Sequence, residues 1–219
     1  MEIDFAGARL AMVESLRSEI SDERVLRAIA RVPREEFVPP EYRHLSYEDR
    51  PIPIGYGQTI SQPLMVAMMT ELLRLRGDEK VLEVGTGSGY QAAILGKLAS
   101  RVVTVERLPD LAEIAGERLR RLGYTNVVVH VASGALGWPE EAPYDGILVT
   151  AGAPRVPRPL VEQLAVGGRL VIPVGRRQIQ QLLSVTRQPD GLKVRRHGPC
   201  RFVPLIGEEA WPEEEASSR

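Results

Sequence analysis

The sequence predicts an α/β fold with a mainly parallel, Rossmann-like sheet, and two observations support this prediction. From residue 80 onward, short hydrophobic runs alternate with amphipathic stretches, as in chains whose strands and helices alternate around a parallel sheet with helices on both faces. Directly after the first run come Gly85, Gly87 and Gly89, one at every second position. Glycine has no Cβ and tolerates positive φ, so such a strand-to-helix turn lets a ligand approach the main chain. A tight turn without a ligand is the alternative interpretation.

The residues before this core predict a helical extension that no flexible linker separates from it. Apolar residues recur at near-helical spacing over 3–19, and a second helix is expected from a cap at 21–22 to the proline at residue 33. The prolines within 39–53 favour an extended chain. A polar loop at 58–63 then leads into a helix at 64–73.

The core continues with a regular order of elements. After the glycine loop we expect a helix at 91–98, a strand at 102–105, a helix at 109–122, strands at 127–131 and 146–149, a short helix through residue 164, a strand at 169–174 and an antiparallel hairpin over 181–196. We therefore expect one domain over 1–207, made of the extension 1–79 and a cofactor-binding core 80–207. An acidic tail at 208–219, expected to be frayed, completes the chain.

The overall composition excludes several classes of protein. The net charge of −1 argues against a nucleic-acid or anionic-membrane surface, and no apolar stretch is long enough to cross a bilayer. A single cysteine, Cys200, cannot form an internal disulfide, and the N-terminus has no pattern of an export signal. We expect a soluble, cytoplasmic monomer without nucleic-acid or membrane partners.

The residues at the strand ends favour an adenosine cofactor that lacks a diphosphate. Glu106 ends the second core strand about 20 residues after the glycine loop, where a carboxylate can bind ribose hydroxyls, although a solvated surface acid is the alternative. The spacing G-x-G-x-G differs from the G-x-G-x-x-G of dinucleotide sites, so an NAD-dependent dehydrogenase is disfavoured. Glu83, just before the loop, would repel a diphosphate but suits a sulfonium. S-adenosyl-L-methionine fits these features best.

Several runs resemble one family closely. They lie at 47–63, 69–73, 81–91, 122–127, 137–139, 144–151, 167–175 and 201–205. The chain is similar over roughly residues 5–207 to the protein-L-isoaspartate (D-aspartate) O-methyltransferases, which are class I methyltransferases. Many methyltransferases share the glycine loop, whereas GQTISQP at 57–63 and RFVPL at 201–205 are specific to this family.

This resemblance implies a protein-repair enzyme. Its reaction would methylate the free α-carboxylate of an L-isoaspartyl or D-aspartyl residue in a damaged protein or peptide, and the ester would then collapse to a succinimide. Ser61 would orient that carboxylate, with Thr59 beside it, although local sequence alone allows both residues to be helix caps. The substrate peptide would lie along Ile60, Gln62, Arg201, Phe202, Val203 and Pro204.

Strand-end placement and the resemblance together define the expected cofactor site. Its residues are Glu83, Gly85, Thr86, Gly87, Ser88, Gly89, Glu106, Arg107, Ala132, Ser133 and Thr150. No metal is expected.

One departure concerns the stretch Ala132-Ser133-Gly134, where the family usually has Gly-Asp-Gly with its acid near the adenine. This departure motivates one alternative, a cofactor-binding homologue that has lost catalysis. A second alternative is a class I methyltransferase for a small molecule, which would keep the glycine loop and Glu106 but have no use for the runs at 58–63 and 201–205.

Overall fold

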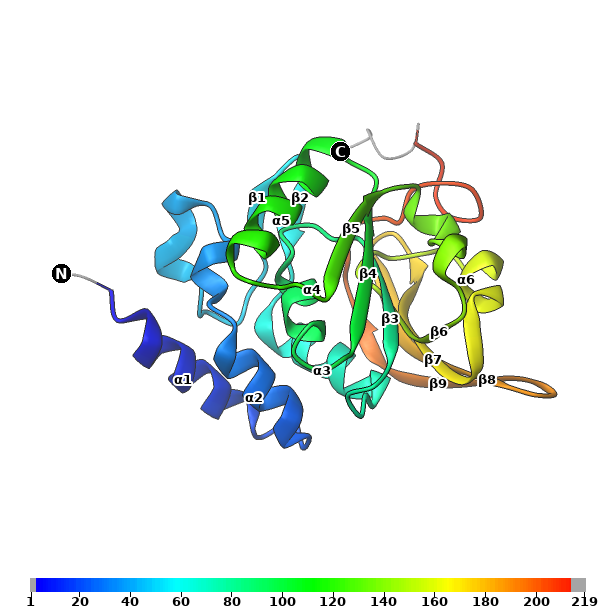
Figure 1. The fold of residues 1–219 in the computed structure, drawn as a ribbon, viewed down its shortest axis with the longest axis horizontal. Coiled ribbons are helices and arrows are strands. Elements are labelled where there is room, and N and C mark those ends of the chain that lie inside the picture. The colour runs from blue at the N-terminus through cyan, green and yellow to red at the C-terminus, as the bar shows by residue number, and fades with distance from the viewer. Residues whose placement is uncertain (1–2, 214–219) are drawn as a thin grey trace.

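The computed structural model of the chain describes residues 3–213, and a seven-stranded sheet runs through its centre (Figure 1). In spatial order the strands are β5 (Val127–Val131), β4 (Arg101–Glu106), β3 (Lys80–Val84), β6 (Tyr144–Val149), β7 (Leu164–Arg176), β8 (Ile179–Gln188) and β9 (Gly191–Cys200). The first five are parallel, whereas β8 and β9 form an antiparallel hairpin that projects at one end of the molecule. The predicted fold class is confirmed.

The order of the strands determines where a ligand can bind. The chain runs from β3 outward through β4 to β5 and then returns to place β6 on the other side of β3. In open α/β sheets, ligands bind beyond the carboxyl ends of the strands at such a reversal. The glycine loop, Glu106 and Thr150 follow or end the three strands concerned.

Helices cover the two faces of the sheet unequally. On one face lie α3 (Pro63–Leu73), α4 (Tyr90–Leu95) and α5 (Pro109–Arg121), and α6 (Arg158–Glu162) lies on the other (Figure 1). Because side chains alternate along a strand, Val81 of β3 packs into the core on the α3–α4 side, whereas Leu82 packs into the second core with Leu160 of α6. Both cores are closely buried, so the strand ends form a rigid base.

The part of the N-terminal extension that precedes α3 packs against α3 and α4. It contains α1 (Phe5–Leu16), α2 (Glu23–Arg31), two 3₁₀ turns (Arg34–Phe37 and Pro40–Leu45), and a ribbon of β1 (Ile52–Gly55) with β2 (Gln58–Ile60). The expectation of an extended chain after the prolines was wrong at Pro40, which starts the second 3₁₀ turn. Proline fits the first position of such a turn because that amide would have no partner there.

Several boundaries differ from the sequence-based expectation, among them those of α4 and β7. Helix α4 ends at Leu95 rather than Leu98, and β7 begins at Leu164 rather than Arg169. Strand β7 passes through Gly167 at a φ of 87°, and its pairing with β6 shifts register between Tyr144 and Gly146. A strand that contains such a bulge continues through glycines that the sequence alone marks as a turn.

The described part of the acidic tail is packed rather than frayed. Ile206 and Trp211 form a parallel bridge, and the indole Nε1 of Trp211 donates to the carbonyl of Gly152 at 3.1 Å. Residues 214–219 of the predicted tail lie outside the described range. The division of the domain into an extension before residue 80 and a cofactor-binding core after it stays a prediction. Within residues 3–213, none of the helices has the length and apolar character needed to span a bilayer.

Candidate active site

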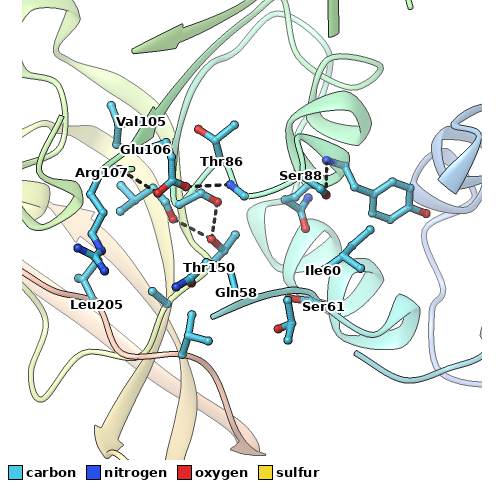
Figure 2. A pocket seen from close by; sticks show the side chains of 18 of the residues that line it. Gln58, Ile60, Ser61, Thr86, Ser88, Val105, Glu106, Arg107, Thr150 and Leu205 are labelled. Carbon is cyan, nitrogen blue, oxygen red and sulfur yellow. Dashed lines mark hydrogen bonds between the residues drawn. The ribbon is translucent and has the colours of Figure 1, made fainter. Parts of the chain in front are cut away.

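A pocket opens at the carboxyl ends of β3, β4 and β6, between the glycine loop and the ribbon β1–β2. Figure 2 shows Glu106 and Arg107 on one side of it and Ser61 and Ile60 on the other. The predicted site residues that line this pocket are Thr59, Ile60, Ser61, Gly85, Thr86, Gly87, Ser88, Glu106, Arg107, Thr150, Val203 and Pro204. Five segments that are separate in the sequence therefore meet in one cavity.

The remaining predicted site residues are not on the pocket wall. They are Glu83, Gly89, Gln62, Ala132, Ser133, Arg201 and Phe202. Gly89 lies behind the loop against Leu119, and Phe202 packs on the core that contains α3. Arg201 is exposed.

The glycine loop is locked against the end of β6. The Thr150 hydroxyl lies 2.7 Å from the carbonyl oxygen of Gly85 and 3.0 Å from that of Val84. Gly85 has a φ of 94°, and a Cβ at this position would lie 2.3 Å from the Thr150 Oγ1. A side chain at residue 85 is therefore excluded twice, by backbone strain and by lack of space. Thr150 lines the pocket, but its hydroxyl is used to hold the loop.

Glu106 is the carboxylate closest to the glycine loop. Its Oε2 accepts from the Gly87 amide at 3.0 Å, and its Oε1 accepts from the amides of Arg107 at 2.9 Å and Leu108 at 3.2 Å. The residue is only 6% exposed. A carboxylate has about four acceptor positions, so three main-chain bonds leave about one position for a ligand hydroxyl. The structure therefore gives Glu106 a structural task that the sequence did not reveal.

Glu83 lies beneath the loop rather than in the pocket. The carboxylate accepts a 2.6 Å bond from the Thr104 hydroxyl, which lies 2.7 Å from the Thr86 hydroxyl, and its Oε1 has no hydrogen-bond partner among the described residues. Burial raises the pKa of Glu83 to about 8, with a smaller contribution from the nearby Glu106 charge. At neutral pH this group is therefore a buried carboxylic acid that supports the loop from below.

Ser61 lies on the opposite wall, directly before α3. The N-cap of α3 is Gln62, whose side chain makes no capping bond, and the Leu64 amide instead donates to the Asp49 carboxylate at 2.8 Å. Asp49 therefore serves the first turn of α3 as the capping group. The Ser61 side chain is free of that task and contributes to the pocket wall.

Another segment of the pocket wall, Val203 to Ile206, runs beside the end of β6. Gly152 donates to the Val203 carbonyl at 2.8 Å and accepts from the Leu205 amide at 2.9 Å. This strand-like pairing fixes the segment along one edge of the pocket. Ser133 faces the continuation of this segment, because its Oγ lies 2.6 Å from the position that a Cβ on Gly207 would take.

Several lining residues were not predicted. They are Gln58, Val66, Met69, Val84, Tyr90, Gln91, Val105, Ala151, Leu205 and Ile206. Helical spacing relates Val66 to Met69, and Tyr90 and Gln91 directly follow the glycine loop, so the pattern contained a signal for these four. Ile206 has none in the sequence, since it reaches the pocket only through the packing of the tail.

The chemistry of the wall is nearly neutral. Apart from the Tyr90 phenol, Glu106 and Arg107 are the ionisable groups among the described residues that line the pocket, and no cluster of metal-binding side chains occurs within residues 3–213. The wall offers main-chain groups, hydroxyls and apolar surface. Such a site can orient a reactive group that is already ionised, but its lining includes no histidine or lysine that could act as a base.

Comparisons with known proteins agree with this geometry. The model of the protein-L-isoaspartate (D-aspartate) O-methyltransferase family matches residues 8–210. A protein-L-isoaspartate O-methyltransferase of Marinobacter nauticus is 56% identical over 213 residues, which cover 95% of this chain and 97% of that protein.

Solved structures agree as well. A protein-L-isoaspartate O-methyltransferase is 31% identical with a TM-score of 0.83, covering 92% of this chain and 67% of the other. A Plasmodium falciparum protein described as a β-aspartate methyltransferase, in complex with S-adenosyl-L-homocysteine, is 28% identical with a TM-score of 0.79, covering 90% of this chain and 98% of the other. The fold is therefore that of a class I methyltransferase. By family match and sequence identity, this chain belongs to the protein-L-isoaspartate (D-aspartate) O-methyltransferase family.

Proposed function

We propose that this protein transfers the methyl group of S-adenosyl-L-methionine to the free α-carboxylate of L-isoaspartyl and D-aspartyl residues in damaged proteins and peptides. One observation carries the proposal: a single pocket joins the glycine loop and Glu106 to Ser61 and the Val203–Ile206 segment. Both segments of the second wall belong to the runs that are specific to this family.

The cofactor would occupy the wall formed by the glycine loop. Main-chain groups of the loop can approach it closely, and the remaining acceptor position of Glu106 suits a ribose hydroxyl. The relative that holds S-adenosyl-L-homocysteine supports this placement, because that molecule is what remains after the methyl group has left. Arg107 and Thr150 would complete this wall, with Ala132 and Ser133 near the adenine end.

The chemical step needs no base in the protein. The substrate carboxyl is ionised at pH 7, since carboxyl groups titrate near ~4. One of its oxygens attacks the methyl carbon, and the carbon–sulfur bond breaks with its electron pair remaining on sulfur. The carboxylate becomes a neutral ester, the sulfonium becomes a neutral thioether, and no proton moves. The near-neutral wall of the pocket fits this reaction.

The protein therefore contributes alignment and the exclusion of water. Oxygen, methyl carbon and sulfur must lie in one line, and alignment of this kind can supply several kcal/mol of the barrier. We assign the orientation of the carboxylate to the Ser61 hydroxyl, with Thr59 beside it. After release, a main-chain amide nitrogen of the substrate attacks the ester carbon, methanol leaves and a succinimide forms. Hydrolysis of this ring gives normal aspartate in a fraction of the molecules.

A methyl-transfer assay with labelled cofactor tests the function. The substrates are an isoaspartyl peptide, its D-aspartyl form and the twin with normal aspartate. We expect transfer to the first two and none to the third. Transfer to small molecules without transfer to the isoaspartyl peptide would contradict the proposal and favour the small-molecule alternative. Calorimetric binding of the cofactor without any transfer would favour a homologue that has lost catalysis.

We further propose that the enzyme acts as a cytoplasmic monomer on protein and peptide substrates, without nucleic-acid or membrane partners. The net charge of −1 supports the absence of nucleic-acid and anionic-membrane partners. Sedimentation of the purified protein tests the monomer, and a dimer at micromolar concentration would contradict it.

A further inference from the structure

Arg34 is a buried cation in the N-terminal extension, outside the pocket wall. It starts the 3₁₀ turn Arg34–Phe37, is 0% exposed, and forms no ion pair within the described part of the chain. Burial lowers its pKa, but an arginine side chain stays protonated in proteins. A buried guanidinium that lacks a carboxylate partner is costly, so its contacts need an explanation.

The contacts of Arg34 are with two main-chain carbonyls and one ring. Its Nε donates to the Ser46 carbonyl at 2.7 Å, and its Nη2 donates to the Ser61 carbonyl at 2.8 Å. The guanidinium carbon lies 4.7 Å from the centre of the Tyr90 ring. Tyr90 lines the pocket and starts α4 directly after the glycine loop. One planar group therefore contacts both the loop that carries Ser61 and the helix that follows the cofactor loop.

These contacts restrict the geometry of Ser61. The guanidinium is a rigid fork, so its bonds to the Ser46 and Ser61 carbonyls and its position over Tyr90 set the distances among these three groups. The carbonyl group of Ser61 and its side chain, which ends in the hydroxyl, are attached to the same Cα. A shift of this carbonyl therefore moves the hydroxyl, and a misplacement of about 1 Å can reduce a rate about 100-fold.

We propose that Arg34 is a positioning residue for methyl transfer. It fixes the position of the Ser61 main chain relative to Tyr90, which lines the pocket. This inference rests on the function proposed above. It assigns the extension a part in the chemical step, through a residue that does not touch the substrate. The alternative is that Arg34 contributes only to folding.

Two substitutions separate these possibilities. Arg34→Lys keeps the charge but cannot hold both carbonyls, whereas Arg34→Met removes the buried charge and keeps most of the volume. Replacing a buried charged group by an apolar one of similar size is often neutral for stability, so Arg34→Met is expected to fold. We expect both variants to lower the single-turnover rate at saturating cofactor and peptide about tenfold, and to leave the Kd of the cofactor within about twofold.

A double-mutant cycle with Ser61→Ala tests whether Arg34 acts through Ser61. If it does, Arg34→Met should change the rate less than about twofold once the Ser61 hydroxyl is absent. Val32→Ala is the matched control, since Val32 is 0% exposed two residues away and its truncation lowers stability without removing either carbonyl bond. The control should keep the wild-type rate below its melting temperature.

Three results would overturn the inference. The first is a wild-type rate in both Arg34 variants. The second is that Arg34→Met lowers the rate by the same factor in the wild-type and in the Ser61→Ala background. The third is that Val32→Ala lowers the rate as much as Arg34→Met. The wild-type protein in the same assay shows whether only the inference about Arg34 fails or the proposed function fails as well. If the wild type is active and the effects of Arg34→Met and Ser61→Ala simply add, only the role of Arg34 is rejected. A wild type that does not methylate the isoaspartyl peptide rejects both.

Discussion

The two walls of the pocket are built in different ways. The cofactor wall consists of strand ends and one loop, held by local bonds such as those of Thr150 to the carbonyls of Val84 and Gly85. The substrate wall comes from a short ribbon, the residues before α3 and the Val203–Ile206 segment. On its Ser61 side, the positions depend on two distant groups, Asp49 and Arg34. The comparison teaches that the topology of the sheet creates the cofactor wall, whereas the Ser61 side of the substrate wall depends on the N-terminal extension, which lies outside the seven-stranded sheet.

The largest effect expected on the cofactor wall is that of Glu106→Ala. Hydrogen bonds to a charged group contribute about 1.5–3 kcal/mol, so losing a ribose bond should raise the Kd of S-adenosyl-L-methionine about 10- to 100-fold by calorimetry. Glu117→Ala on the exposed side of α5 is the control and should bind normally. An unchanged Kd in Glu106→Ala would mean that the carboxylate serves only the main chain of the loop.

On the substrate wall, Ser61→Ala should lower kcat/KM for the isoaspartyl peptide about tenfold or more, since one transition-state hydrogen bond can carry a few kcal/mol. The Kd of the cofactor should stay near the wild-type value. Asp49→Ala is the comparison for capping and should lower the free energy of unfolding by ~1 kcal/mol. Full activity in a destabilised Ser61→Ala protein would make Ser61 a cap after all.

Glu83 should make the protein less stable as the pH rises. Its pKa is about 8 in the folded state against an ordinary value of 4.5, so between these values the folded state holds a proton that the unfolded state has lost. The free energy of unfolding should therefore fall with rising pH by up to ~1.4 kcal/mol per pH unit in this window. Glu83→Gln should flatten the slope between pH 6 and pH 8, measured by denaturant unfolding, with Glu117→Gln as control. Equal slopes in wild type and Glu83→Gln would show that burial does not hold this proton.

The smallest expected effect concerns Ser133, which lies outside the residues that line the pocket. If serine contributes a weaker adenine contact than the family's usual aspartate, Ser133→Asp should tighten cofactor binding by about 1 kcal/mol, or about fivefold. The Ser133 hydroxyl faces Gly207, so the new carboxylate must turn toward the pocket to do this. Unchanged or weaker binding would mean that other residues already serve the adenine.

The fold and the cofactor wall followed from local rules. Alternating hydrophobic runs and the spacing of Gly85, Gly87 and Gly89 were enough to predict a mainly parallel sheet and the position of the loop. The same rules predicted that Glu83 belongs to the site, but it does not line the pocket. Sequence spacing does not tell whether a residue of a buried strand faces the ligand or the layer beneath it. In the structure its side chain turns toward Thr104 and away from the pocket.

The substrate wall could not be derived from patterns, only from the family resemblance. Nothing in the spacing of Ser61 and Val203 indicates that they line one pocket, because this depends on how distant segments pack. Whether Ser61 or another group caps α3 was likewise open until Asp49, fifteen residues before Leu64 in the chain, was found on the Leu64 amide. Tertiary bonds of this kind leave no local signal.

The most direct test of the two-wall account is a crystal structure with S-adenosyl-L-homocysteine and an isoaspartyl peptide bound together. The account predicts the ribose beside Glu106 and the peptide along Val203–Ile206, with the α-carboxylate within hydrogen-bonding distance of the Ser61 hydroxyl and in line with the cofactor sulfur. A peptide bound elsewhere, or a carboxylate that lies away from Ser61 while the cofactor occupies the glycine loop, would contradict it.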